Sequence, residues 1–262
     1  MIGASSVLAW VMVIGFTGSI PWAIADIRTT PGPATWQVAG MVVNGLSYAA
    51  GLLLAYRALV IGRVSIVAPI VSTEGGLAAL ASVTLGESLG LPTALVLAAL
   101  AVGIVLASME RSGEGGPGGA DPALTRRTAL LSIGAALAFS VGMTVSARLG
   151  PEVPISWIVL VSRGVGVVII ALPLLVRGRL RLSRQALPLV LVSGVLEALG
   201  SGLYVIGAHV SPAAAAVLSS QFAAITAVGA FILFGERLTR IQLVGVAIIA
   251  MGVTGLAVIR AA

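Results

Sequence analysis

The sequence contains no cysteine, no lysine and a single histidine, His209. Without cysteine it has neither disulfide bonds nor thiolate metal sites, and one histidine cannot form an imidazole cluster. Charged residues make up only 9% of the chain, and its 15 cationic side chains are all arginines. We therefore expect no bound metal and no cofactor.

Apolar residues dominate what remains. They make up 58% of the 262 residues, and the mean hydropathy is +1.13. A water-soluble globule of this length cannot bury so much apolar surface, so the lipid bilayer is the expected partner. The arginines lie mostly between apolar runs, which is typical of membrane proteins and argues against nucleic-acid binding. The first apolar run has no basic segment before it and no clean cleavage site, so we interpret it as a retained helix.

Nine apolar runs approach the roughly 20 residues that a spanning helix needs. They are Val7–Ile24, Gln37–Arg57, Val64–Leu85, Pro92–Met109, Thr128–Leu149, Ile155–Val176, Ala186–Ala208, Pro212–Phe234 and Ile241–Ile259. The loops between them are short except for residues 111–125, a polar Gly/Pro-rich linker that we expect neither to pack nor to form a helix. The pattern predicts an all-α integral membrane protein of the plasma membrane with nine visible spans.

The linker separates two copies of one plan. A shift of 149 residues lays Gly86-Glu87-Ser88-Leu89 on Gly235-Glu236-Arg237-Leu238 and also aligns the helices before them. We therefore predict a first repeat at residues 1–110 and a second at 126–262. The second has five helices and the first only four, so either the chain has nine spans or its start codon lies downstream of the true one. Because five is an odd number of spans, we expect the two repeats to be inverted.

The arginines are divided unevenly between alternate loops. With the N-terminus on side one, eleven fall on that side and three, Arg28, Arg148 and Arg260, on the other, while Arg163 lies inside a helix. The positive-inside rule then places the N-terminus in the cytoplasm, and an odd number of spans places the C-terminus outside.

Two apolar runs end in Gly-Glu-x-Leu and are followed at once by a helix with a late glycine, at Gly86–Gly103 and Gly235–Gly252. This pattern resembles the end of the EamA repeat of the drug/metabolite transporter superfamily, and the whole chain fits the resemblance. The second repeat, with Arg163 in its second helix and Ser211-Pro212 opening its fourth, is the better match. The first repeat lacks the family's opening helix and departs again at Val64–Leu85, which is about three residues shorter than its partner run.

The resemblance implies a transporter of ten helices, built from two inverted five-helix repeats around a central cavity. It also implies movement of small organic solutes such as amino acids, other metabolites or drugs, often by export. A family member with both termini in the cytoplasm conflicts with the topology inferred from the arginine count, which places the C-terminus outside.

Inverted repeats place a substrate site near the bilayer midplane, so ionisable residues at mid-span are the first candidates. Glu74 lies ten residues into the run Val64–Leu85, where an unpaired carboxylate is costly. Loss of hydration favours its neutral form, which makes Glu74 a candidate for proton exchange in a proton-coupled carrier. The alternative is a carboxyl group that only fixes helix packing. Gly75 and Gly76 follow it and are expected to allow a helix break or a close helix approach.

Arg163 and Glu197 lie at mid-span on neighbouring helices of the second repeat. We expect an ion pair between them that joins the two helices. The alternative is that the Arg163 guanidinium binds a substrate carboxylate through its two parallel N–H groups.

Several uncharged polar residues are candidates for a cavity lining. Tyr48 aligns with Glu197 under the shift, and Asn44 lies one turn before Tyr48 on the same helical face. Ser220 and Gln221, with Ser72, Thr73 and Ser219, are candidates for the few hydrogen bonds that orient a ligand in an apolar pocket. For each of them, a hydrogen bond between helices is the alternative.

Glu87 and Glu236 end their helices, and we expect each to accept hydrogen bonds from the first free N–H groups of the following helix. We expect His209 to be interfacial. The tryptophans lie mostly near run ends and fit an aromatic belt, with ligand stacking as an alternative for the last: Trp10, Trp22, Trp36 and Trp157. Small-residue spacings such as Gly194-x3-Ala198 fit close packing within a monomer, and a homodimer contact is the alternative.

These features favour a secondary transporter of small organic solutes that works as an exporter, either coupled to protons or by exchange. An integral-membrane enzyme acting on a lipid-linked substrate is the alternative, but the sequence has no His/Asp/Glu cluster, no nucleotide loop and no serine motif with a histidine partner. A membrane scaffold subunit is a further alternative, although intramembrane Glu and Arg residues exceed what a scaffold needs.

Overall fold

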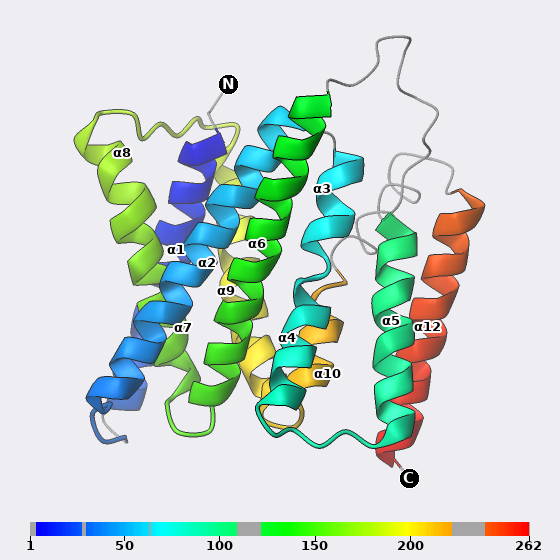
Figure 1. Cartoon of the computed structure of the whole chain (residues 1–262). Coiled ribbons are helices and arrows are strands. Elements are labelled where there is room, and N and C mark those ends of the chain that lie inside the picture. The colour runs from blue at the N-terminus through cyan, green and yellow to red at the C-terminus, as the bar shows by residue number, and fades with distance from the viewer. Residues whose placement is uncertain (1–3, 28–29, 63, 109–121, 222–238, 262) are drawn as a thin grey trace. The chain divides into compact units, whose positions relative to one another are not determined.

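The computed structural model describes residues 4–27, 30–62, 64–108, 122–221 and 239–261 (Figure 1). Within these residues all regular structure is helical, which confirms the all-α class. Five helices are long and apolar enough to cross a membrane: Ser5–Ile27, Thr35–Ile61, Ala123–Leu149, Ile155–Val176 and Leu187–Ala208. The total number of spans and the inverted relation of the repeats stay predictions.

The chain folds into two compact units, and each unit contains segments from both halves of the sequence. Unit 1 comprises Met1–Leu52 and Val141–Val210, and unit 2 comprises Leu53–Ser140 and Ser211–Ala262. Two of the three boundaries fall inside long helices, α2 (Thr35–Ile61) and α6 (Pro122–Leu149), and the third follows Val210. The repeat boundaries given above are a separate division of the sequence and stay a prediction.

Unit 1 is built around helix α1 (Ala4–Ile27), which packs on α7 (Ile155–Gly166) and α9 (Leu187–Ala208). The last turns of the predicted span Ile155–Val176 are a π-helical segment, η1 (Val167–Ala171), and a short helix, α8 (Leu172–Val176). The core of the unit consists of Ala23, Met41, Leu149, Val153, Trp157, Ile158 and Val205. Apolar side chains from α1, α2, α6 and α9 therefore meet at the N-terminal half of α7, and this packing fixes the helix that carries Arg163.

Unit 2 contains a close helix pair, α5 (Leu91–Ser108) and α12 (Arg240–Ala261). A Cβ on Gly252 would lie 2.6 Å from the Leu100 side chain, so the missing side chain is what lets these helices approach. Three shorter helices belong to the same unit: α3 (Val64–Val71), α4 (Glu74–Thr84) and α10 (Pro212–Ser219). Helix α10 packs on both α4 and α5.

Three of the predicted segments need correction. The run Val64–Leu85 is not one helix, because α3 ends at Val71 and α4 begins at Glu74. In the run Pro212–Phe234, helix α10 ends at Ser219, and the part after Gln221 lies outside the described residues. The linker was expected to contain no helix, but α6 begins within it at Pro122, since proline fits the first position of a helix, where its missing N–H is not needed.

Candidate functional site

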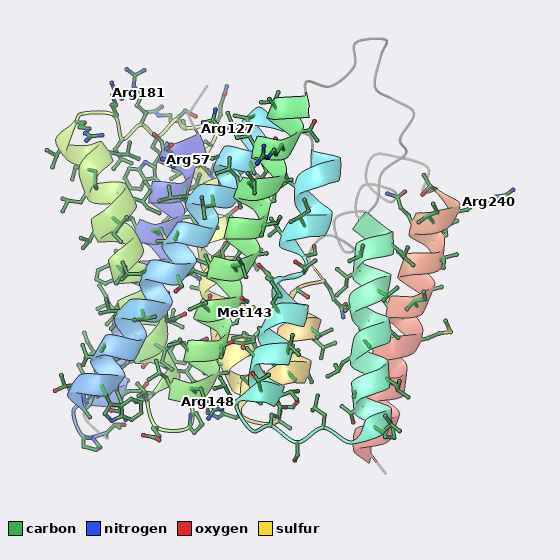
Figure 2. All side chains as sticks on the ribbon, viewed as in Figure 1. Arg57, Arg127, Met143, Arg148, Arg181 and Arg240 are labelled. Atoms are coloured by element: carbon green, nitrogen blue, oxygen red, sulfur yellow. The ribbon has the colours of Figure 1, made fainter. Side chains whose placement is uncertain are left out.

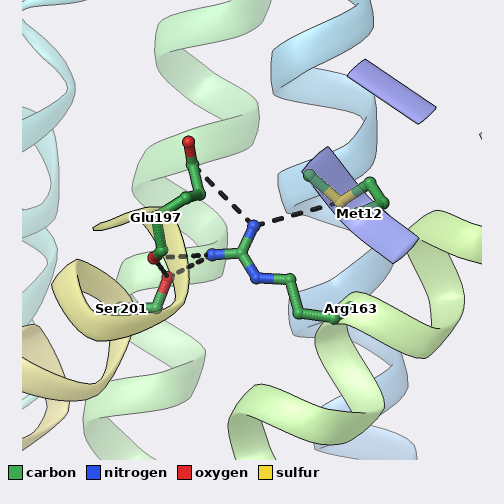
Figure 3. Close-up of polar contacts among 4 residues, drawn as sticks. All are labelled: Met12, Arg163, Glu197 and Ser201. Carbon is green, nitrogen blue, oxygen red and sulfur yellow. Dashed lines mark hydrogen bonds and ion pairs between the residues drawn. The ribbon is translucent and has the colours of Figure 1, made fainter. Parts of the chain in front are cut away.

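A buried arginine on α7 organises the polar residues of unit 1. Arg163 is only 1% exposed, and its Nη2 donates hydrogen bonds to the backbone carbonyl of Glu197, 2.9 Å away, and to Ser201 Oγ. Its Nη1 lies 3.8 Å from Glu197 Oε1 and 3.9 Å from the sulfur of Met12 (Figure 3). One guanidinium group therefore joins α1, α7 and α9.

Tyr48 on α2 completes this cluster. The Arg163 Cζ atom lies 4.6 Å from the centroid of the Tyr48 ring, within the range of a cation–π interaction. Tyr48 and Glu197 are the two residues that the repeat alignment places at equivalent positions, and both contact the same guanidinium. The alignment identified the two residues, but it did not indicate that they share Arg163 as a partner.

The predicted contact between Arg163 and Glu197 is present, but its geometry is not that of a two-pronged ion pair. Only one nitrogen of Arg163, Nη1, lies near the Glu197 carboxylate, at 3.8 Å from Oε1. The shorter contact is the 2.9 Å hydrogen bond from Nη2 to the Glu197 backbone carbonyl. The Glu197 side chain is 32% exposed, in contrast to Arg163. Of the two roles considered for Arg163, its burial favours the structural one, and the accessible charged group of the cluster is the Glu197 carboxylate.

The backbone around Arg163 is shaped to hold its side chain. A Cβ on Gly15 would lie 3.3 Å from Arg163 Cδ, and a Cβ on Gly166 would lie 2.6 Å from the Met12 sulfur. Directly after Gly166 the helix widens into the π-helical segment η1. Single π-helical turns of this kind are frequent at functional sites.

The other candidates of unit 1 differ in exposure, since Asn44 and Trp157 are buried and His209 is exposed. Asn44, one turn before Tyr48, is 8% exposed, and its Oδ1 lies 3.3 Å from where a Cβ of Gly142 on α6 would be. The aromatic-belt assignment of Trp157 is wrong, because Trp157 is a core residue whose Nε1 donates to the Ala23 carbonyl at 3.2 Å. His209 is exposed at the C-terminal end of α9, as expected of an interfacial residue.

In unit 2 the break between α3 and α4 lies at Ser72–Thr73, in the middle of the predicted span. The first hydrogen bond of α4 runs from the Leu77 N–H to the Thr73 carbonyl at 3.0 Å. The Thr73 side chain does not cap the helix, because its Oγ1 donates to the Ile70 carbonyl. The chain therefore turns at Ser72–Thr73 without a side-chain cap on α4.

The C-terminal end of a second helix, α10, lies beside this break. Helix α10 is followed by a turn at Ser220–Gln221, and α10 lies beside α4 (Figure 1). A Cβ on Gly75 would lie 2.3 Å from both the Ala216 carbonyl oxygen and Ser220 Oγ, so only glycine allows this contact. Of the two roles expected of the glycine pair, Gly75 makes the close approach, whereas the break lies before the pair at Ser72–Thr73.

The polar groups at this break are largely without partners. Glu74, the first residue of α4, is half-buried, and its side chain makes no hydrogen bond or ion pair with any residue that the structure describes. Ser72 Oγ and Gln221 Nε2 are buried and have no hydrogen-bond partner, whereas Ser220 Oγ donates to the Val217 carbonyl at 3.0 Å. The candidates Glu74, Ser220 and Gln221 thus belong to unit 2, and Asn44, Tyr48, Arg163 and Glu197 belong to unit 1.

Glu87 caps a helix, but not the helix that we expected. Gly86, with a φ of 103°, adopts the left-handed conformation that ends α4 and turns the chain, which glycine does without strain. Glu87 then accepts a hydrogen bond from Ser211 Oγ at 2.6 Å and one from the Ala213 N–H at 2.9 Å, at the start of α10. The following helix, α5, was the predicted partner. The equivalent residue Glu236 lies outside the described residues.

The uneven distribution of arginines is visible in the structure. In unit 2, Arg57, Arg127 and Arg240 lie on the same side of the unit, and in unit 1 Arg181 and Arg148 lie on opposite sides (Figure 2). This arrangement agrees with the assignment of Arg148 to the arginine-poor side. The orientation itself stays a prediction.

Sequence reasoning missed Met12 and Ser201, which both contact Arg163. Neither could have been selected, because an apolar helix contains many such methionines and serines and the partner on α7 is distant in the sequence. The interval of four residues between Glu197 and Ser201 was the available signal, since it places both on one helical face.

Comparison with known proteins identifies a family and a fold. The model of the EamA-like transporter family matches residues 126–258, just over half of the chain. No curated protein matches the sequence. A solved structure titled only "Crystal structure of protein" is 19% identical to this chain, covers 99% of it and 90% of its own length, and has a TM-score of 0.74. At this identity the similarity shows the fold alone.

Proposed function

We propose, from the premise that this chain belongs to the EamA-like transporter family, that it exports small organic metabolites across the plasma membrane by alternating access. The family is one of membrane transporters, and the apolar helices are those of a multi-pass integral membrane protein. The export direction, the metabolite substrate and proton coupling are the parts that we add to the family assignment.

The observation that carries the proposal is the state of Glu74. This carboxyl group begins a half-helix in the middle of an apolar run and has no partner among the described residues. A structural carboxylate in a membrane is normally paired, because an unpaired one is costly there. A group that exchanges protons must instead be free to change its charge, which makes Glu74 the candidate for coupling.

The break at Ser72–Thr73 supports the same assignment. Interrupted helices place free backbone groups at the depth where carriers bind their substrates, and they also provide hinges for alternating access. Ser220 and Gln221 bring the end of α10 to the same place. We assign Glu74, Ser220 and Gln221 to the coupling and binding region of unit 2.

Unit 1 has a different role in this proposal. Arg163 holds Glu197 and Tyr48 in fixed positions, and both of these side chains remain partly exposed. With the neighbouring Asn44, they form a polar surface that contributes to substrate selectivity. Arg163 itself positions this surface without touching the substrate.

The experiment is untargeted metabolite profiling of the medium and the cytosol of cells that express the native chain or Glu74→Gln at equal membrane abundance. The native chain is expected to shift a small set of metabolites from the cytosol to the medium, and the variant is expected to reduce that shift to the level of cells without the chain. Equal profiles for native and empty cells would argue against export, and equal profiles for native and variant would remove Glu74 from the mechanism.

A further inference from the structure

The connection between α8 and α9, residues 177–186, concentrates positive charge at one end of unit 1. We call this segment the arginine loop, because it contains Arg177, Arg179, Arg181 and Arg184. All four arginines are exposed, and none of their side chains makes an ion pair with a residue that the structure describes. The loop therefore offers four guanidinium groups to a partner outside the described chain.

The described carboxyl groups of unit 1 lie away from this loop. Asp26 accepts a hydrogen bond from Ser156 in the first turn of α7, and Glu152 lies in the turn before that helix. The span Ile155–Val176 separates both from the arginine loop by roughly 30 Å. Glu197 lies near the middle of α9. No described carboxylate of unit 1 can therefore balance the charge of the loop.

The arginine loop begins and ends where exposed apolar surface ends. Val176, the last residue of α8, is 78% exposed, and Leu189, in the first turn of α9, is 72% exposed. Exposed apolar residues at the end of a membrane span contact the acyl chains, so the loop between these two helices lies at the level of the lipid headgroups. Long arginine side chains at this level reach the headgroup phosphates.

The backbone of the loop is fixed at both ends. Gly178, with a φ of 62°, ends α8 in the left-handed conformation, and its N–H donates to the Leu175 carbonyl at 2.9 Å. The Arg179 N–H donates to the Leu174 carbonyl at 2.8 Å. At the other end, the Ser183 carbonyl accepts hydrogen bonds of 3.1 Å from the N–H groups of residues 186 and 187 at the start of α9. The loop is therefore an ordered connection between its two helices.

A buried serine of α1 holds the middle of the loop. Ser6 is 6% exposed, and its Oγ donates to the Arg179 carbonyl at 3.2 Å and accepts a hydrogen bond from the Arg181 N–H at 3.5 Å. The loop thus contacts α1 as well as the two helices that it connects. Because its backbone is held at these points, less conformational entropy is lost when the arginines bind a ligand.

We propose that the arginine loop, positioned by Ser6, binds the headgroups of anionic phospholipids. A guanidinium group binds two phosphate oxygens through parallel N–H groups, and it stays charged at every physiological pH. Clusters of basic residues beside a membrane span attract anionic lipids, and each residue contributes about fivefold to the affinity. The bound lipid stabilises the contact of α1 with α8 and α9, and this surface works independently of the solute that the chain transports.

Binding can be tested on the purified full chain in a neutral detergent. The probes are phosphatidylglycerol, phosphatidylcholine with the same acyl chains, and inorganic phosphate, and the readouts are lipid retained in native mass spectra and the rise in Tm. We expect phosphatidylglycerol to be retained and to raise the Tm, and the other two probes to have little effect.

Two results of this titration would overturn the proposal. An equal effect of phosphatidylcholine would mean that the chain binds acyl chains and does not recognise the headgroup charge. An equal rise in Tm with inorganic phosphate would mean that the arginines form a site for free anions and not a surface for lipids.

Matched arginine variants locate the surface. Arg181→Gln is expected to weaken phosphatidylglycerol binding about fivefold, and Arg179→Gln/Arg181→Gln about 25-fold. Arg148→Gln is the control, because it removes the same charge from the opposite side of unit 1 (Figure 2). We expect this control to keep the native affinity. Equal losses for Arg181→Gln and Arg148→Gln would show that binding follows net charge alone and would refute the surface.

Ser6→Ala tests whether the loop must be held in place. The variant keeps every charge but releases the loop from α1, so we expect it to bind phosphatidylglycerol about threefold more weakly. Ser19→Ala is the control, because Ser19 is also a buried serine of α1 and its Oγ donates only to the Phe16 carbonyl of its own helix. Equal affinities for these two variants would refute the positioning role of Ser6.

Discussion

Each unit of this protein holds one polar cluster among apolar helices, and the two clusters differ in how fully their hydrogen bonds are made. Around Arg163, both terminal nitrogens have partners on other helices, and Nε is the one group left over. At the break before α4, Ser72 Oγ and Gln221 Nε2 lack partners among the described residues. A satisfied cluster joins helices, whereas an unsatisfied one leaves donors for a ligand. A charge within a membrane helix is therefore not sufficient to identify a binding site.

The largest effect that this comparison predicts is at Arg163. Arg163→Ala removes the cation beside the Glu197 carboxylate and the hydrogen bonds to the Glu197 carbonyl and Ser201, and it opens a cavity, so we expect a loss of about 3–5 kcal/mol and little folded protein. Glu197→Ala keeps the carbonyl bond and is expected to cost less than about 1 kcal/mol. The measurement is the yield and Tm of monodisperse protein in detergent.

The double variant Arg163→Ala/Glu197→Ala sharpens the result. Because the principal bond of Arg163 goes to the backbone, we expect the double variant to be as unstable as Arg163→Ala alone. Recovery of expression in the double variant would instead show that the carboxylate is the main partner.

A smaller effect is expected at the crossing of α4 and α10. Gly75→Ala places a methyl group 2.3 Å from a backbone carbonyl oxygen, which forces the helices apart at a cost of about 1–3 kcal/mol. Gly76→Ala is the matched control, because its methyl group meets no described atom and alanine favours the helix. A lower Tm for Gly75→Ala and an unchanged or higher Tm for Gly76→Ala are the expected results. Equal Tm values for the two variants would mean that α10 does not contact α4 closely at Gly75.

The smallest stability effect concerns the cap on α10. Glu87→Ala removes both hydrogen bonds at the start of this helix and is expected to lower stability by about 1–2 kcal/mol. Glu152→Ala is the control, since Glu152 is exposed and accepts only a 3.3 Å bond from Gln37. A Glu87 variant as stable as the control would show that the cap does not hold α10 against α4.

The sequence predicted the continuous helices well, because long apolar runs such as Thr128–Leu149 admit no other structure in a bilayer. It predicted Val64–Leu85 as one span and noted only that Gly75 and Gly76 would allow a break or a close approach, whereas the break lies just before them at Ser72–Thr73. The structure describes the linker only from residue 122 on, and there the prediction was wrong, because Pro122 begins a helix that the composition did not suggest.

The partners of the polar residues could not be predicted. Glu87 was expected to cap the next helix in the chain, but it caps α10, 126 residues away from it at Ala213. Similarly, the contact between Arg163 and Glu197 could be predicted because their helices are neighbours in the sequence. That Arg163 bonds mainly to the Glu197 backbone carbonyl could not be predicted, because this depends on how deeply each side chain is buried. Such contacts arise from packing between segments that are distant in the sequence.

The most direct test of the account is the response of export to the pH of the medium, measured for the native chain, Glu74→Gln and Glu197→Ala at equal membrane abundance. If unit 2 couples transport to protons and unit 1 sets selectivity, export by Glu197→Ala keeps the native pH response, although its amounts or range of solutes change. Glu74→Gln then shows no pH response. The opposite result, a pH response that survives in Glu74→Gln and disappears in Glu197→Ala, would contradict the assignment and place coupling in the Arg163 cluster.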